Sequence, residues 1–211
     1  MIPNSSDALT RKYDATIVGA GAAGGVMAKE LSEKGMKVAL IEAGPYLEPK
    51  DFMPFEQIYQ NERFWSGGLE PNTEMSIIFV RGRGVGGTTL VNQCLMDRAK
   101  PWVFEWWSDI SGKKEFNAEN MNQWYSKIED QMHLEVMNYP QDFNGNNLRM
   151  VEGFEKQGLS WRCLRRGQTN CEDCIHCLGG CPLGSKQGTN ITFIPKAMQL
   201  GAEVISGYEI D

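Results

Sequence analysis

The pattern of apolar and polar positions near the start of the chain predicts a β-α-β unit. Residues 13–18 form a short apolar run typical of a buried strand, and residues 37–42 form a second one. Between them, residues 22–34 carry small side chains on one side and charged side chains on the other, which is typical of a helix packed on a sheet. The unit spans about 30 residues, the usual size of this motif. We therefore expect an α/β fold.

The following part of the chain carries a weaker pattern. Residues 45–75 contain four prolines and predict a loop with short helices. Residues 76–80 form a short run of β-formers, and residues 88–97 are expected to open a helix. Near the end, residues 194–200 predict a short helix and residues 203–205 a short strand. These last two elements would return the chain to the first domain.

A longer helix is predicted in the middle of the chain. Asn117 is a good N-cap, and apolar side chains recur at helical spacing from Met121 through Trp124 to Met132. We expect this stripe to face the core. The same interpretation covers four earlier aromatic residues, with an aromatic wall beside a ligand as the alternative: Trp102, Phe104, Trp106 and Trp107.

Composition places the chain among ordinary folded proteins. Of its 211 residues, 41% are hydrophobic and 23% are charged, which argues against a disordered or fibrous chain. The patterns divide it into five expected segments: a polar N-terminal tail (1–12), the first part of the α/β domain (13–100), a helical and aromatic insertion (101–160), an irregular cysteine-rich loop (161–193) and a return segment (194–211).

Charge and hydropathy exclude several partners. The net charge of -6 and a pI near 5.1 make the surface repel phosphate backbones, so no nucleic-acid partner is expected. The sequence contains no run of about 18 apolar residues, so no direct membrane span is expected. Residues 1–11 lack an apolar signal core and a twin arginine, which favours a cytoplasmic location for a chain that acts alone.

A dinucleotide fingerprint, G-x-G-x-x-G, follows the first predicted strand and opens the first helix, which is the context it requires. Its glycines are Gly19, Gly21 and Gly24, and Ala22 and Ala23 separate the last two. Gly19 would permit the tight turn, Gly21 would let the main chain approach a diphosphate, and Gly24 would let the helix pack on the strand. The start of a helix also attracts an anion through its free N–H groups.

Glu42 ends the second predicted strand, about 20 residues after Gly21. A carboxylate in this place accepts hydrogen bonds from the hydroxyl groups of a ribose. Its charge would repel a 2′-phosphate, so NADP is disfavoured. This unit alone leaves the choice between FAD and NAD open.

A second glycine-rich loop runs from Gly82 to Asn92 with the sequence GRGVGGTTLVN. Gly86 and Gly87 are followed by two hydroxyl residues, so bare main chain can approach a ligand with donors beside it. Asn92 adds a side chain that both donates and accepts. Such a loop can reach the diphosphate or the isoalloxazine ring of a flavin. A plain glycine-rich turn is the alternative.

Together the two loops resemble the glucose-methanol-choline (GMC) family of flavoprotein oxidoreductases. Residues 13–45 resemble the N-terminal FAD unit of that family, and residues 81–98 match its first signature as far as Asn92, with a departure at Met96. The resemblance implies a Rossmann-like FAD-binding domain, incomplete in this chain, with an irregular cysteine-rich insertion.

The resemblance also implies which residues would contact FAD. Some members attach FAD to a histidine near the second loop, but none lies there in this sequence, so non-covalent FAD is expected. Ile210 would meet the adenine through its main chain. The other positions carried over come from the two loops and the end of the second strand: Gly19, Gly21, Ala22, Ala23, Gly24, Glu42, Ala43, Gly44, Arg83, Gly86, Gly87, Thr88 and Asn92.

Pyridine-nucleotide disulfide reductases are a rival interpretation, because they carry a similar GGT loop followed by a cysteine pair. Here Thr89 occupies the place of the first cysteine, and Cys94 stands alone. The redox disulfide of that class could not form in the same way, which disfavours it.

Four cysteines are spaced as C-x₂-C-x₂-C-x₃-C-P, a pattern typical of bacterial ferredoxins. They are Cys171, Cys174, Cys177 and Cys181, and an iron–sulfur cluster is therefore a candidate cofactor. The fourth ligand is a difficulty, because the cysteine before proline serves a different cluster in two-cluster ferredoxins. Three alternatives would resolve it: Cys181 folds back to the same cluster, a remote thiol such as Cys163 serves as a ligand, or the cluster is a three-iron type. Structural thiols, disulfides and zinc remain alternatives.

The activity implied by the resemblance is oxidation of a CH–OH group in an alcohol, polyol, sugar or sugar acid. Hydride would pass to flavin N5 and electrons onward to an acceptor. GMC enzymes take the hydroxyl proton with a histidine near the C-terminus. His133 and His176 match no such motif, so we expect an N-terminal fragment that is inactive alone, with its catalytic residues elsewhere.

Within the GMC family, the chain resembles the FAD-binding large subunits of bacterial gluconate, fructose and glucose dehydrogenases. This resemblance implies a small subunit and a cytochrome acceptor as partners, and some of these subunits hold an iron–sulfur cluster near the flavin. Export with such a partner would place the protein in the periplasm or at a membrane. A non-catalytic FAD-binding fragment and an iron–sulfur electron-transfer module are the alternative functions.

Overall fold

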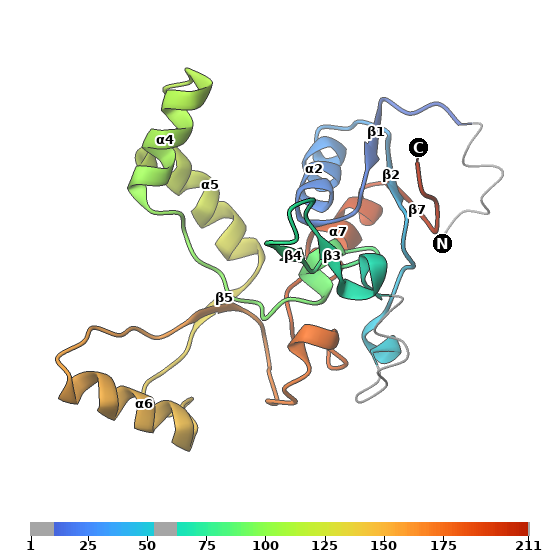
Figure 1. The fold of residues 1–211 in the computed structure, drawn as a ribbon. Helices are drawn as coiled ribbons and strands as arrows, with labels where there is room; N and C mark the ends of the chain where they lie inside the picture. The colour runs from blue at the N-terminus through green and yellow to red at the C-terminus, as the bar shows by residue number, and fades with distance from the viewer. Residues whose placement is uncertain (1–10, 53–62, 211) are drawn as a thin grey trace. The chain divides into compact units, whose positions relative to one another are not determined.

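The computed structural model describes residues 11–52 and 63–210, and the chain divides into two compact units (Figure 1). Unit 1 comprises Met1–Cys94 and Asn170–Asp211, and unit 2 comprises Leu95–Thr169. The first ten residues of the expected polar tail lie outside the described residues.

A three-stranded parallel sheet in the order β1-β2-β7 is the centre of unit 1 (Figure 1). Its strands are β1 (Ala15–Val18), β2 (Val38–Glu42) and β7 (Glu203–Ser206), and α2 (Ala22–Glu33) connects the first two. In the register, Ala39 of β2 pairs with Thr16 of β1 and with Glu203 of β7. The predicted β-α-β unit and the late strand are confirmed, and the fold is Rossmann-like α/β.

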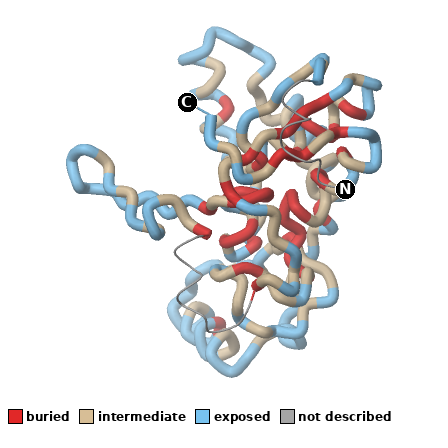
Figure 2. Tube along the Cα trace, turned by 90° about the vertical axis from the view of Figure 1, so that its right-hand side faces the viewer, coloured by how far each residue is buried: buried red, intermediate tan, exposed pale blue. Residues whose placement is uncertain are grey.

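The main core of unit 1 lies between this sheet and two helices, α2 and α7 (Phe193–Gln199). Side chains alternate along a strand, so Val38 and Leu40 face these helices while Ala39 packs on the other side. Buried residues are red in Figure 2. The helix-side cluster contains Ala20, Ala28, Val38, Leu40, Val85, Ile194, Ala197, Ala202 and Val204.

Short elements make up the rest of unit 1. The predicted helix over residues 88–97 is wrong: only one 3-10 turn forms there, because the Asn92 side chain accepts the N–H of Cys94 (2.9 Å), which adopts a left-handed φ of 53°. Two-residue strands β3 and β4 pair antiparallel. The bounds are η1 Pro49–Asp51, η3 Trp65–Gly68, β3 Glu70–Pro71, β4 Ile78–Phe79, η4 Gly87–Leu90 and η5 Cys177–Gly179.

Unit 2 contains three helices and a two-stranded antiparallel sheet among its residues, all of which the structure describes. The predicted N-cap of its second helix is confirmed, because the Asn117 side chain accepts the N–H of Asn120 (2.9 Å). The elements are α4 (Pro101–Ser111), α5 (Ala118–Gln131), β5 (Leu134–Val136), α6 (Gly145–Lys156) and β6 (Arg165–Gly167).

The aromatic residues of unit 2 are covered unevenly. Phe104 is buried, and its ring meets those of Trp107 and Tyr125 edge to face. Trp124 is 54% exposed and Trp102 is 64% exposed, so the expectation that the whole set faces a core is wrong. Phe104 of α4 packs on Tyr125 of α5, and neighbouring aromatic positions on the two helices lie outside this contact.

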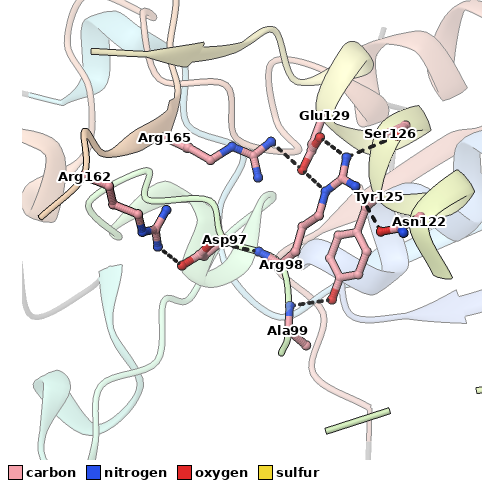
Figure 3. Close-up of polar contacts among 9 residues, drawn as sticks. All are labelled: Asp97, Arg98, Ala99, Asn122, Tyr125, Ser126, Glu129, Arg162 and Arg165. Atoms are coloured by element: carbon pink, nitrogen blue, oxygen red, sulfur yellow. Dashed lines mark hydrogen bonds and ion pairs between the residues drawn. The ribbon is translucent and has the colours of Figure 1, made fainter. Parts of the chain in front are cut away.

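Partly buried ion pairs join the elements of unit 2 around Glu129 on α5 (Figure 3). Its carboxylate accepts hydrogen bonds from Nε of Arg98 (2.8 Å) and Nη2 of Arg98 (2.6 Å), and pairs with Nη2 of Arg165 on β6 (2.8 Å). Nearby, the main-chain N–H of Ala99 donates to the hydroxyl of Tyr125 (3.2 Å). The hydrogen bond from Arg98 holds the pKa of Glu129 below its ordinary value of 4.5.

Replacing Glu129 by Gln should lower the free energy of unfolding by about 1–3 kcal/mol at neutral pH, because two arginines lose their shared counter-ion. The folded pKa lies below the unfolded one, so this contribution is present above pH 4.5 and is lost as the pH falls through the folded value. In urea unfolding followed by circular dichroism, the difference between wild type and E129Q should shrink on acidification.

Asp130→Asn is the matched control, since Asp130 is the exposed neighbour on the same helix. Two results would contradict the stabilising role of Glu129. One is an equal loss of unfolding free energy in both variants, and the other is a difference between wild type and E129Q that does not change with pH.

Candidate functional site

A cavity of about 600 Å³ lies at the carboxyl ends of β1 and β2 in unit 1. Nine of the residues predicted from the sequence line it: Gly19, Gly21, Ala22, Glu42, Ala43, Gly87, Thr88, Asn92 and Ile210. The carboxyl edge is where open parallel sheets bind their ligands.

The two glycine loops meet through their main chains at this cavity. Gly86 donates its N–H to the carbonyl of Ala20 (2.9 Å). Gly87 has a φ of +52°, and a Cβ on it would lie 2.7 Å from the Cα of Gly21. The loops can approach this closely because neither carries a side chain at the crossing point.

The first loop is closed by Gly24, on the first turn of α2. A Cβ on Gly24 would lie 1.9 Å from the carbonyl oxygen of Gly19, so any larger residue would push the helix away from the loop. Gly21 is the N-cap of α2 and lines the cavity. The partial positive charge of the helix start therefore lies beside the cavity.

Glu42 binds the first loop to the end of β2. It is 6% exposed; its Oε2 accepts the N–H of Ala20 (2.8 Å) and its Oε1 accepts the N–H of Gly44 (2.9 Å). Spacing alone did not reveal this supporting role. A carboxylate has about four lone-pair sites, so Glu42 keeps acceptor capacity on the side that lines the cavity.

Five predicted residues do not line the cavity: Ala23, which is exposed on the first turn of α2, and Gly24, Gly44, Arg83 and Gly86, which support the loops. Arg83 donates to the carbonyl of Ala43 (3.2 Å). A Cβ on Gly44 would lie 2.3 Å from the nitrogen of Gly84, so the chain after β2 also touches the second loop through bare main chain.

Hydroxyl groups brace the second loop internally. Thr88 accepts the N–H of Gly82 (3.1 Å), and Thr89 donates to the carbonyl of Gly86 (2.5 Å). The Thr89 hydroxyl also accepts the N–H of Thr189 (3.1 Å), which connects the loop to the chain before α7.

The sequence interpretation missed eight lining residues: Val18, Ile41, Trp65, Arg81, Gly82, Thr89, Tyr208 and Glu209. The ring of Trp65 lies within 5.8 Å of Arg81 and 5.4 Å of Arg83, measured from guanidinium carbon to ring centre. Residues 45–75 carry no period that could have marked Trp65. Tyr208 and Glu209 had a signal, because they follow a strand whose carboxyl end lies at the same edge.

The four cysteines of the cysteine-rich loop are all partly exposed: Cys171, Cys174, Cys177 and Cys181. In the part of the chain that the structure describes, no three His, Cys, Asp or Glu side chains lie where they could hold a metal ion. The geometry therefore does not support a cluster on these four residues, and the spacing remains the observation behind that prediction.

Two buried cations attach this loop to the rest of unit 1. Lys186 is 6% exposed and donates to the carbonyls of Leu90, Asn92 (3.0 Å) and Cys177 (2.7 Å). Burial lowers the pKa of Lys186 to about 8. Arg63 donates to the carbonyl of Gly179 (2.9 Å).

The parallel sheet, its glycine-rich turn and a cavity at the carboxyl edge define a Rossmann-like domain of the kind that binds dinucleotides in oxidoreductases. The GMC oxidoreductase family model matches residues 13–211, so the chain belongs to the GMC oxidoreductase family.

Similar curated proteins include a long-chain-alcohol oxidase of Arabidopsis thaliana, 28% identical over 98% of this chain and 28% of its own length. Another is an uncharacterized GMC-type oxidoreductase of Sinorhizobium fredii, 28% identical over 96% of this chain and 40% of its own length. The chain thus spans well under half the length of these relatives.

Two solved structures share the fold. Pyridoxine 4-oxidase from Mesorbium loti matches with a TM-score of 0.68 and 16% identity, over 93% of this chain and 42% of its own. A fungal aryl-alcohol oxidase matches with a TM-score of 0.61 and 17% identity, over 92% of this chain and 38% of its own.

Across residues 11–52 and 63–210, no helix has the length and apolar character needed to cross a membrane.

Replacing Gly24 by Ala should destabilise the protein by about 2–3 kcal/mol, because the new methyl group overlaps the carbonyl of Gly19. Gly145→Ala is the control, since a Cβ there meets nothing within 4 Å. Urea unfolding followed by circular dichroism measures both. Equal stability of the two variants would show that the tight turn is not needed.

Proposed function

We propose that the cavity of unit 1 binds FAD non-covalently and that the protein oxidises a CH–OH group. One observation carries the proposal: two glycine loops, far apart in sequence, touch through bare main chain at the carboxyl edge of the sheet. A diphosphate needs main-chain donors at close range, and the start of α2 at Gly21 would supply them. The N–H groups of Gly86 and Gly87 already donate to Ala20 (2.9 Å) and Gly84 (2.7 Å), so the second loop would contribute close approach of bare main chain.

Each part of FAD has a proposed partner among the lining residues. Gly21 and the start of α2 would hold the diphosphate, and Glu42 would accept from a ribose. Thr88 and Asn92 of the second loop would face the flavin, and Ile210 would meet the adenine. The supporting residues Gly24, Gly44, Arg83 and Gly86 would keep these groups in place, and Ala23 on the first turn of α2 stays a proposed FAD contact.

When bound, FAD supplies an acceptor for hydride at its N5 position, and the residues of this chain bind and orient it. Alcohols, polyols, sugars and sugar acids are the proposed donors. The names of the relatives agree with alcohol chemistry: one is a long-chain-alcohol oxidase and one an aryl-alcohol oxidase. Electrons would then pass to a cytochrome, which is the proposed acceptor. A small subunit is the second proposed partner.

The group that takes the hydroxyl proton is proposed to lie in residues beyond this chain. A general base must come within hydrogen-bond reach of the substrate hydroxyl. His176 lies in the cysteine-rich loop and His133 lies in unit 2, and neither lines the cavity.

FAD binding can be tested with Gly87→Ala. Its methyl group would lie 2.7 Å from the Cα of Gly21, and alanine disfavours the φ of +52°, so the loops must separate. Fluorescence titration should show FAD affinity reduced about tenfold or more relative to wild type. Gly153→Ala, where a Cβ meets nothing within 4 Å, should bind as wild type does.

If wild type binds no FAD, the proposed cofactor is wrong; if G87A binds it normally, the loop crossing is not the site. The iron–sulfur prediction has a separate test. Iron and sulfide analysis after anaerobic purification should find neither if the thiols are free, whereas stoichiometric amounts of both would establish a cluster.

A further inference from the structure

The cysteine-rich loop and the FAD cavity share one buried side chain, Lys186. Its Nζ donates to the carbonyl of Cys177 in the loop and to those of Leu90 and Asn92 at the end of the second glycine loop. Asn92 lines the cavity. The ammonium group has three N–H donors, so the three carbonyls use all of them.

These carbonyls belong to irregular main chain, which is buried at Leu90 and partly buried at Asn92 and Cys177. The carbonyl of Cys177 also accepts the N–H of Gly180 (3.4 Å). A buried carbonyl without a donor is costly, and neither the turn at Leu90 nor the 3-10 turn at Cys177 belongs to a sheet. The position of Nζ therefore fixes the separation between the two segments. Three thiol groups also lie near enough to act on its charge: Cys94, Cys177 and Cys181.

A second contact holds the same loop from the other side. Arg63 donates to the carbonyls of Gly179 (2.9 Å) and Asp51 (2.7 Å) and lies over the ring of Phe52. Phe52 packs with Leu90 of the second glycine loop. The main chain of Gly180 touches Phe52 so closely that a Cβ would lie 1.9 Å from its ring. The cysteine-rich loop thus packs on Phe52, which also packs on Leu90 of the second glycine loop.

We propose that Lys186 is a positioning residue that couples the order of the cysteine-rich loop to occupancy of the FAD cavity. A ligand that fixes the main chain at Asn92 also fixes the carbonyls that bind Nζ of Lys186. The lysine then holds the main chain of Cys177 in place. Coupling of two sites is reciprocal, so loosening the loop weakens FAD binding by the same factor. The inference rests on the proposed function, because it takes FAD as the ligand.

The experiment measures alkylation of Cys177 by iodoacetamide, with peptide mass spectrometry to identify the site, in the presence and absence of saturating FAD. Cys163, which belongs to unit 2, is the internal reference. In wild type, FAD should slow alkylation of Cys177 about fivefold or more while leaving Cys163 unchanged.

Lys186→Met should speed alkylation of Cys177 without FAD, remove most of the protection by FAD, and weaken FAD binding by a similar factor. Lys186→Arg, which keeps a cation with several donors, should restore part of the protection. Lys29→Met is the matched control: Lys29 is 2% exposed, but it pairs with Glu30 (3.1 Å) and Glu33 (2.8 Å) within α2. In this control variant, FAD should still protect Cys177 from alkylation.

Wild type that binds FAD but shows no protection of Cys177 would overturn the inference without any variant. Equal protection in K186M and K29M would overturn it as well. Failure of wild type to bind FAD would instead refute the proposed cofactor, and in that case the faster alkylation of K186M without FAD still tests the attachment by Lys186.

Discussion

Two stretches of main chain in unit 1 touch at Gly21 and Gly87, and the surrounding contacts preserve that touch. Gly24 brings α2 against the first loop, and the carboxylate of Glu42 takes the N–H groups of Ala20 and Gly44. Thr89 connects the second loop to the chain before α7. A cavity bounded by main chain in this way has donors at fixed positions before any ligand arrives, so little ordering is needed on binding.

Local sequence was most informative for the first β-α-β unit. The strand–turn–helix–strand from β1 to β2 follows from apolar period and glycine spacing, and these act within about 30 residues. The cavity wall is less predictable, because it collects residues from distant parts of the chain. Trp65 lies in a segment without a periodic pattern of apolar residues. The hydrogen bonds of Glu42 go to main-chain N–H groups, which leave no signal in the amino-acid sequence.

The spacing of residues in a helix predicts which of them share a face, but not which residues they contact in the fold. Helical spacing correctly predicted α5, but Tyr125 packs on Phe104 while the neighbouring Trp124 is largely exposed. The arginines around Glu129 leave no periodic trace, since ion pairs need only proximity in space. In the same way, the cysteine spacing suggests ligands, but in the described structure the main chain of that loop is held by Lys186 and Arg63.

The place of β7 and α7 in the chain has a consequence for biosynthesis. Val38 and Leu40 are covered partly by α7, yet all of Leu95–Thr169 is translated between β2 and that helix. During synthesis the first β-α-β unit must therefore wait with part of its apolar face uncovered, although α2 already packs on it. Unit 2 is one continuous stretch of chain and can fold before α7 is made. Closing such distant contacts slows folding, and the nascent chain is most prone to aggregate in this interval.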